Sequence, residues 1–401
     1  MDKVRPVETA LLIGILSVVL NLLVPDVRIG SFTLHLSPVD AIFLLVALSS
    51  TVFRWEGVKY VLTRNRAYYL LSGLFLSAVL LSALLSPAPL PSLKETFQIA
   101  AYLWILPLIL AYDPDIPWVY RIGGEVLVLL SALVLLPYFY VLGWARFNPF
   151  NLHPNPTGFL FALFSVVLAH YGYTAYSLLS VILTSMTFSR SAMGSLFSAF
   201  VLKGAVERGK RAFNFASAIV TVALLFASPY ALRGFLNLRT YVNSHVLHTE
   251  GYERKYKPPI DVVRGESYEV LRLLMWEATY RMWEKRPLTG IGFGRYREEW
   301  KAQCRKGDLP KKVCTKWVEN VDPHNLFVQI LGETGVLGFL TFSIFLIFLF
   351  LRVAGNPLSL TVLIMTLLFS LLQPSPLFTR NLAPLVWLLL FYGGVVRWKG
   401  D

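Results

Sequence analysis

Apolar runs of membrane-spanning length recur from one end of the chain to the other, with short polar stretches between them. A helix needs roughly 17 to 25 residues to cross about 30 Å of hydrocarbon. On this pattern helices are expected over residues 9–24, 37–53, 67–86, 93–112, 122–144, 157–170, 175–188, 191–202, 212–232, 335–351, 358–374 and 383–396. The sequence therefore predicts an all-α polytopic membrane protein with about 12 transmembrane helices.

The ends of two of these segments depend on more than apolar length. Residues 175–205 are too long for one crossing, since a single helix would measure about 46 Å at 1.5 Å per residue. We place a break at Ser189, Arg190 and Ser191. The run over residues 9–24 has a short basic start but no small-residue cleavage site after it, so it is expected to remain as the first helix.

Polar residues gather in one long loop, residues 233–323, which separates nine predicted helices (residues 1–232) from the last three (residues 324–401). This loop holds 18 basic and 12 acidic residues together with four tryptophans. The mixture predicts a folded, partly helical loop domain that rests on the membrane surface. Its best helix is expected over residues 266–285.

Composition and charge narrow the class of protein. Hydrophobic residues make up 55% of the chain and charged residues only 15%, which argues against an ordinary soluble enzyme. With both termini in the cytoplasm, the inner segments carry 14 Lys and Arg and the short outer loops carry 5, as the positive-inside rule requires. The long loop then lies outside, and most of the +13 net charge reports topology rather than a nucleic-acid partner.

The only two cysteines, Cys304 and Cys314, both lie in this outer loop. An oxidising compartment allows a small disulfide loop between them, and two free thiols are the alternative. Two sulfurs without a neighbouring histidine do not make a zinc site, so no metal is expected. The segment GIGFGRY at 290–296 lacks the third glycine and the preceding strand of a dinucleotide site, and no cofactor is expected either.

Two arginines are candidates for anion binding. Arg190 stands between apolar helices, where an arginine is costly unless it meets a negative charge; a side chain that merely extends to the interface is the alternative. Arg272 shares one helical stripe with Trp276 and Trp283, with Arg281 on the flank. A planar guanidinium there suits phosphate groups, and a solvated face of an amphipathic helix is the alternative.

His324 is the candidate base. It follows Asp322 and Pro323, which are expected to be the N-cap and the first residue of the next helix. A helix N-terminus keeps a histidine neutral and able to accept a proton, and its amides favour a nearby diphosphate. A lone histidine is more often structural, but the company of Arg190 and Arg272 at the outer face favours catalysis.

In order and spacing these segments resemble the O-antigen ligase family, together with the related O-antigen polymerases and protein O-oligosaccharyltransferases. The similar pieces are SRSAMG at 189–194, RLLMWEA at 272–278, PLTGIGFG at 287–294 and HNLFVQILGETGVLGFL at 324–340. The resemblance implies transfer of a glycan from an undecaprenyl diphosphate carrier to an acceptor hydroxyl in the bacterial inner membrane, without metal or nucleotide. The long loop and the site would then be periplasmic.

The resemblance also implies roles for residues of this chain. His324 would be the general base that permits attack with inversion, while Arg190 and Arg272 would bind the diphosphate. Further candidates to support that site are Arg146, Arg264 and Arg281. Glu333 is expected to support packing of the helix against the loop and is the reserve candidate for the base.

Two kinds of acceptor substrate are compatible with the sequence. With lipid A-core as acceptor the protein is a ligase, which the single long loop between Arg190 and His324 favours; with a second lipid-linked repeat unit it is a polymerase. A secondary transporter is the alternative from another class. It predicts ionisable residues at mid-membrane and paired interrupted helices, whereas Glu125 is the main ionisable residue inside a predicted span.

Overall fold

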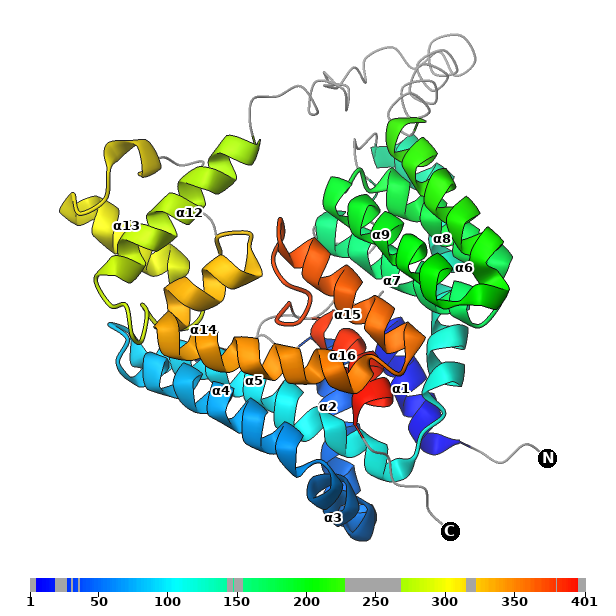
Figure 1. Ribbon diagram of the computed structural model, residues 1–401, viewed down its shortest axis with the longest axis horizontal. Coiled ribbons are helices and arrows are strands. Elements are labelled where there is room, and N and C mark those ends of the chain that lie inside the picture. Colours follow the sequence, from blue (N-terminus) through cyan, green and yellow to red (C-terminus); the bar gives the residue numbers. More distant parts are fainter. Residues whose placement is uncertain are drawn as a thin grey trace. The chain divides into compact units, whose positions relative to one another are not determined.

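The computed structural model of the chain describes residues 5–18, 27–29, 32–34, 37–142, 147, 154–227, 268–314, 322–379 and 381–395. Its contacts divide the chain into two compact units (Figure 1). The first unit comprises Met1–Gly14, Asp26–Ile116 and Ser267–Asp401, and the second comprises Ile15–Pro25 and Pro117–Glu266.

The first unit is almost wholly helical. Its described residues also include one antiparallel β-hairpin, formed by β1 (Val27–Ile29) and β2 (Phe32–Leu34). Helix α5 continues into a π-helical turn and a 3-10 helix that end at Tyr112. Its α-helices are α1 (Pro6–Leu16, most of which belongs to this unit), α2 (Pro38–Phe53), α3 (Trp55–Arg64), α4 (Arg66–Leu84), α5 (Pro89–Ala100), α12 (Tyr268–Glu284), α13 (Tyr296–Lys306), α14 (Leu326–Val353), α15 (Pro357–Ser370) and α16 (Ala383–Gly394).

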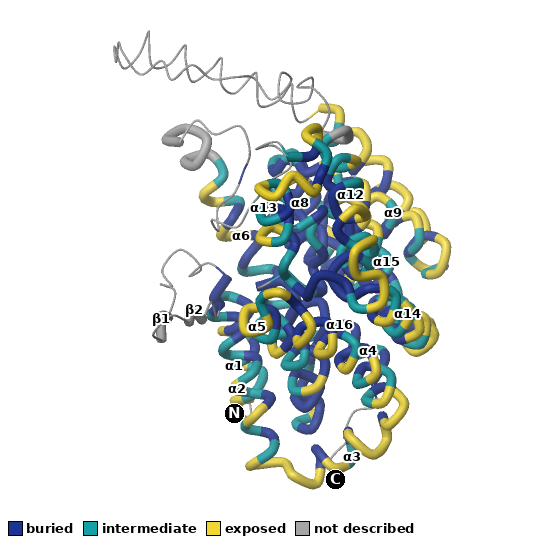
Figure 2. Tube along the Cα trace, turned by 90° about the vertical axis from the view of Figure 1, so that its left-hand side faces the viewer, coloured by how far each residue is buried: buried dark blue, intermediate teal, exposed yellow. Residues whose placement is uncertain are grey.

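Apolar side chains join the long helices of this unit. Helices α4 and α14 run side by side in Figure 1, and aromatic rings pack between them: the Phe75 and Phe342 centroids lie 5.1 Å apart and those of Tyr68 and Phe345 lie 5.7 Å apart. Helix α16 is buried along nearly its whole length, as the dark-blue tube of Figure 2 shows. A helix that is apolar on every side is thus placed in the interior of the unit.

The second unit is built around α7 (Pro154–His170), which is buried on all sides from Thr157 to Ala169. Among its described residues the accompanying helices are α6 (Ile116–Leu142), α8 (Thr174–Met186), α9 (Arg190–Val206) and the helix Arg211–Ala227. Serine hydroxyls link α7 to α8, since Ser180 Oγ donates to the carbonyl of Phe161 at 2.7 Å. The break predicted near Arg190 is confirmed, because α8 ends at Met186 and Ser189 caps α9.

Each of the twelve predicted spans overlaps a helix of the structure, so the helical membrane architecture is confirmed in outline. Among the described residues, four helical stretches are long and apolar enough to cross a membrane: Arg66–Leu84, Pro89–Tyr112, Ile116–Leu135 and Leu326–Val353. The pair α2 and α3, bent by 106°, would add a fifth. The number of about 12 crossings stays a prediction.

Residues 268–314, within the predicted loop, fold around a small apolar core of their own. Helix α12 confirms the helix predicted over residues 266–285, with ends shifted by one or two residues. The core consists of Met275, Ala278, Met282, Ile291, Tyr296, Trp300, Leu309 and Val313. These side chains pack α12 against α13 and against the 3-10 turn Lys311–Val313.

Helix α14 contains a break at Gly335, whose backbone is left-handed (φ 68°, ψ −170°). In an unbroken helix the amides of Val336 and Leu337 would donate to the carbonyls of Gly332 and Glu333, four residues earlier. The break removes both bonds. Four polar backbone groups in an apolar helix therefore need other partners.

Residues 287–292, just beyond α12, supply all four partners. Their carbonyls at Pro287 and Leu288 accept from the two freed amides at 2.9 and 3.2 Å, and their amides at Ile291 and Gly292 donate to the two freed carbonyls at 3.1 and 2.9 Å. The contact is so close that a Cβ on Gly335 would lie 2.3 Å from the carbonyl oxygen of Leu288. The glycine is required by both its conformation and this approach.

We expect Gly335→Ala to lower the free energy of unfolding by about 1–3 kcal/mol, because an alanine there is strained and clashes with Leu288. Gly355→Ala is the matched control, since a Cβ at Gly355 meets nothing within 4 Å. Thermal unfolding in detergent micelles, followed by tryptophan fluorescence, measures both. Equal melting temperatures for the two variants would contradict the account of the break.

Candidate functional site

His324 does not lie in a helix, which corrects the sequence prediction. Asn325 is the N-cap of α14 and the helix begins at Leu326. The side chain of Asp322, expected to be the cap, instead accepts from the backbone amide of His324 at 2.7 Å. Because that turn occupies the carboxylate, Pro323 and His324 remain outside the helix.

The backbone of His324 is left-handed, with φ 53°. Histidine adopts this conformation more readily than most residues, yet it still costs about 1–3 kcal/mol and is typical of functional sites. Three hydrogen bonds of the next residue, Asn325, hold the backbone at His324 in place. Asn325 Oδ1 accepts from the amides of Phe327 and Val328, and Asn325 Nδ2 donates to the carbonyl of Leu371 at 2.9 Å.

The imidazole of His324 is three-quarters buried, and its Nδ1 lies 3.5 Å from Asp322 Oδ1. Burial lowers the pKa of His324, the negative charge of Asp322 opposes this, and the positive charge of Arg272 lowers the pKa further. Burial also raises the pKa of the Asp322 carboxyl. The net result is an imidazole that is neutral at pH 7 and able to accept a proton.

Arg272 and His324 are brought together by α12. The indole of Trp276 donates to the carbonyl of Pro323 at 2.9 Å, so α12 holds the chain immediately before His324. Arg272 lies one turn earlier on the same stripe of α12 and is half-buried. The positive charge of Arg272 therefore acts on the imidazole.

Glu333 is fully buried and already occupied by hydrogen bonds. Its carboxylate accepts from the amides of Gly294 and Tyr296 at 3.0 and 3.2 Å and from Gln329 Nε2 at 3.1 Å. Ser82 Oγ donates to its backbone carbonyl at 2.6 Å. These bonds join the break in α14 to the first turn of α13, where a negative charge is favourable.

Arg190 is the exposed first residue of α9, in the second unit. Ser189 Oγ accepts from the amide of Ala192 at 3.3 Å and fixes the start of the helix. The turn before it packs on α7, since a Cβ on Gly158 would lie 3.0 Å from the Cβ of Ser189. A positive side chain at a helix N-terminus is unfavourable by itself, so this end of α9 favours an anion.

The other predicted arginines divide into two groups. Arg281 is exposed and its guanidinium is bound to Glu284, with 3.2 Å between NH1 and Oε2. Its position therefore favours a surface ion pair. Arg146 and Arg264 lie outside the described residues.

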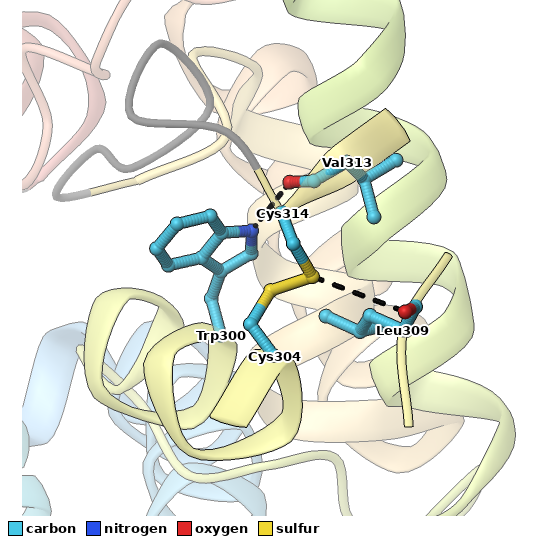
Figure 3. Close-up of a disulfide and its surroundings, with 5 residues drawn as sticks. All are labelled: Trp300, Cys304, Leu309, Val313 and Cys314. Carbon is cyan, nitrogen blue, oxygen red and sulfur yellow. Dashed lines mark hydrogen bonds between the residues drawn. A yellow bond between two sulfur atoms is a disulfide. The ribbon is translucent and has the colours of Figure 1, made fainter. Parts of the chain in front are cut away.

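Cys304 and Cys314 form a disulfide, with their Cα atoms 5.6 Å apart (Figure 3). The bond joins the last turn of α13 to the end of the 3-10 turn at Val313. Beside it the indole of Trp300 donates to the carbonyl of Val313 at 3.0 Å, and Cys314 Sγ contacts the carbonyl of Leu309. The disulfide closes the small core of residues 268–314.

Sequence reasoning missed three contributors to this site. For Trp276 the helical stripe was predicted, but not the hydrogen bond of its indole to the carbonyl of Pro323. For Asp322 a helix cap was predicted, but its carboxylate accepts from the amide of His324 instead. The spacing Asp-Pro-His was a usable signal, since an Asp side chain commonly accepts from the amide two residues on. Tyr296 is fully buried and, among the described residues, its hydroxyl has no hydrogen-bond partner; the charge of Asp322 adds to burial in raising its pKa.

Within the described part of the chain, no group of three or more His, Cys, Asp or Glu side chains could hold a metal ion. In a comparison with protein families, residues 175–343 match the model described as O-antigen ligase. The matched range includes Arg190, Arg272, His324 and Glu333. No curated protein matches the sequence.

We expect His324 to titrate below 6.5, its ordinary value. Arg272→Met removes a positive charge and should raise the pKa of His324, whereas Asp322→Asn removes a negative charge and should lower it further. NMR of 15N-histidine-labelled protein measures the titration, with the His324 signal assigned from His324→Gln. Titration at or above 6.5, or no response to Arg272→Met, would contradict the arrangement.

Proposed function

We propose that this chain, a member of the O-antigen ligase family through residues 175–343, is an inner-membrane glycosyltransferase that moves a glycan from undecaprenyl diphosphate to an acceptor hydroxyl. The family supports a membrane glycosyltransferase in outline. The single observation that carries the finer proposal is the pairing of a neutral, strained His324 with Arg272. One group accepts a proton and the other carries a fixed positive charge.

In this proposal His324 is the general base. The acceptor hydroxyl gives its proton to the imidazole as its oxygen forms a bond to the anomeric carbon. The bond between that carbon and the phosphate oxygen breaks on the opposite face, so the configuration inverts and undecaprenyl diphosphate leaves with the electron pair. A histidine whose pKa is lowered by burial is neutral at pH 7 and is ready to accept the proton without prior deprotonation.

Arg272 and Arg190 bind the diphosphate in the same proposal. Negative charge builds up on the diphosphate as the glycosidic bond breaks, and a guanidinium fixed in advance stabilises that charge more in the transition state than in the bound donor. Arg272 is held on α12 beside His324. Arg190 is assigned from the family resemblance, and its place at the N-terminus of α9 supports an anion there.

Glu333 is a positioning residue here and not the base. Three donors already surround its buried carboxylate. Its bonds fix the junction between α14 and the segment before α13, and α14 begins directly after His324 and its neighbour Asn325. Loss of this carboxylate is therefore expected to act through the geometry of the loop.

The membrane placement follows from charge. The excess of Lys and Arg in the predicted inner segments supports a topology with both termini in the cytoplasm and the long loop in the periplasm. The donor's polyprenyl tail requires a site at the membrane edge, and the position of His324 just before the candidate span Leu326–Val353 supports such a site. Lipid A-core is the acceptor we favour, and a second lipid-linked repeat unit is the alternative.

Reconstitution tests the proposal. The purified chain in liposomes receives an undecaprenyl diphosphate glycan with either lipid A-core or a second donor molecule, and products are separated by gel and identified by mass. Capped lipid A-core is the expected product. A ladder growing on the carrier would instead show a polymerase, and no transfer with either acceptor would refute both.

Two arginines of α12 provide a matched comparison in that assay. Arg272→Met should lower the rate about 100-fold or more, because a charge that stabilises the leaving group is lost. Arg281→Met should change the rate less than about twofold, since Arg281 forms an exposed pair with Glu284. His324→Gln should lower the rate by about 10²–10⁴-fold. Similar rates for the two arginine variants would remove Arg272 from the site.

A further inference from the structure

Helix α3 lies between two sharp elbows at the end of the first unit where α2 stops and α4 starts (Figure 1). The first elbow is Arg54, where the chain turns by 106° from α2 into α3. Backbone hydrogen bonds continue through it, since the amide of Arg54 donates to the carbonyl of Ser50 at 2.8 Å and the amide of Val58 donates to the carbonyl of Arg54 at 2.9 Å. The second elbow is Asn65, a buried residue whose Nδ2 donates to the carbonyl of Val61 at 2.7 Å. These bonds fix the direction of α3 relative to its two neighbours.

Both ends of α3 are expected at the same surface of the membrane. Helix α4 is a candidate span that starts at Arg66, directly after the second elbow. Helix α2 fills most of the span predicted over residues 37–53, and its last two side chains, Val52 and Phe53, are each 74% exposed, as lipid-facing residues would be. One helix therefore leaves the bilayer where α3 begins, and the next enters it where α3 ends. A ten-residue helix between these two points runs along the membrane surface and not across it.

One face of α3 packs on the protein. Its side chains, at Gly57, Val58 and Val61, are buried. A Cβ on Gly57 would lie 2.8 Å from the carbonyl oxygen of Ala111, near the end of the 3-10 helix Leu106–Tyr112. This close packing leaves the other faces of α3 to the surroundings of the protein.

The remaining surface of α3 divides into an apolar flank and a polar face. Trp55 and Leu62, two turns apart on the flank, are 51% and 39% exposed. The polar face carries Glu56, Lys59 and Thr63, all exposed, and Lys59 Nζ lies 2.9 Å from Glu56 Oε1. Tryptophan and leucine suit the boundary of the acyl chains, and the polar face suits water. This division is typical of a helix that lies in the membrane interface.

Three arginines stand at the two ends of this helix without acidic partners. Arg54, Arg64 and Arg66 are exposed, and within the described part of the chain their guanidiniums form no ion pair or hydrogen bond. The guanidinium of Arg64 lies over the ring of Tyr60, 5.6 Å from its centroid. A planar guanidinium binds a phosphate through two parallel N–H bonds. Three such groups at the end of a membrane span therefore favour the phosphates of lipid headgroups.

We propose that α3 is a lipid-binding helix that lies in the interface of the inner leaflet and binds the phosphates of anionic phospholipids through Arg54, Arg64 and Arg66. In this arrangement Trp55 and Leu62 lie at the boundary of the acyl chains. Because α4 starts at the second elbow and bonds near its other end to the broken helix α14, the bound lipids also fix the depth of a helix that supports the candidate site. The inference does not depend on the proposed glycan transfer, since it concerns how the chain is held in the bilayer.

Two adjacent positions test the orientation of α3. The two cysteines of the chain form the disulfide Cys304–Cys314, so a cysteine introduced by Leu62→Cys or Thr63→Cys can be spin-labelled selectively. In liposomes that contain phosphatidylglycerol, EPR should find the label at position 62 accessible to oxygen and the label at position 63 accessible to a water-soluble nickel chelate. Two labels in water would show a helix free for a soluble partner, and two labels in hydrocarbon would show a broken or re-entrant span. Either result would overturn the proposal.

Native mass spectrometry of the full chain in detergent tests the lipid selectivity. The probes are phosphatidylglycerol and phosphatidylcholine with the same acyl chains, and wild-type protein should retain more of the first. Each of Arg54→Gln, Arg64→Gln and Arg66→Gln should weaken the binding of phosphatidylglycerol about fivefold, the effect of one cation near the membrane surface. The binding of phosphatidylcholine should not change.

A matched control separates this effect from a general loss of positive charge. The arginine variant combines the three changes above, and the control variant combines Arg305→Gln, Lys306→Gln and Lys311→Gln, which remove three positive charges from exposed positions in or next to α13. All six side chains are exposed, so neither variant should lower the melting temperature. Equal retention of phosphatidylglycerol by the two variants, or no preference for it in the wild type, would overturn the lipid site. Neither measurement requires glycan transfer, so the lipid site and the proposed function can fail separately.

Discussion

The exchange of backbone hydrogen bonds between the broken helix α14 and residues 287–292 is the contact on which the candidate site depends. Without it, the carbonyl of Gly332 and the amides of Val336 and Leu337 would lose these partners, and the carbonyl of Glu333 would keep only the hydroxyl of Ser82. With it, the helix bends at Gly335 while every freed group is paired. The carboxylate of Glu333 extends the same junction to the first turn of α13. One small region therefore connects a membrane helix to the folded part of the loop.

This junction has consequences at both of its ends. On one side, α12 is held against α14, and Trp276 reaches the chain before His324. On the other, α13 and the disulfide close a core that a short polar segment would not form alone. His324, whose pKa is lowered by burial and by Arg272, thus lies just before the start of an apolar helix, and α12 carries Arg272.

Much of the local structure was predictable because it depends on neighbours in sequence. The helices, the break before Arg190 and the helix around Arg272 follow from apolar periodicity and capping. The prediction that Asp322 caps the helix was wrong, and the reason is also local. Its carboxylate could accept from the amide of a helical residue or from that of His324, and in the structure it accepts from His324. Asn325 then became the cap. Competition between turn and cap is not resolved by residue type alone.

The sequence by itself indicated a helical membrane protein, a resemblance to O-antigen ligases over residues 175–343, and the residue types that carry charge and accept protons, because composition and spacing are properties of the chain. Only the tertiary structure decided what the glycines and Glu333 do. Gly335 and residues 287–292 lie more than forty positions apart in sequence, and their pairing depends on hydrogen-bonding groups that every residue possesses. Backbone groups carry no signature in the sequence, so their partners become visible only when the chain is folded.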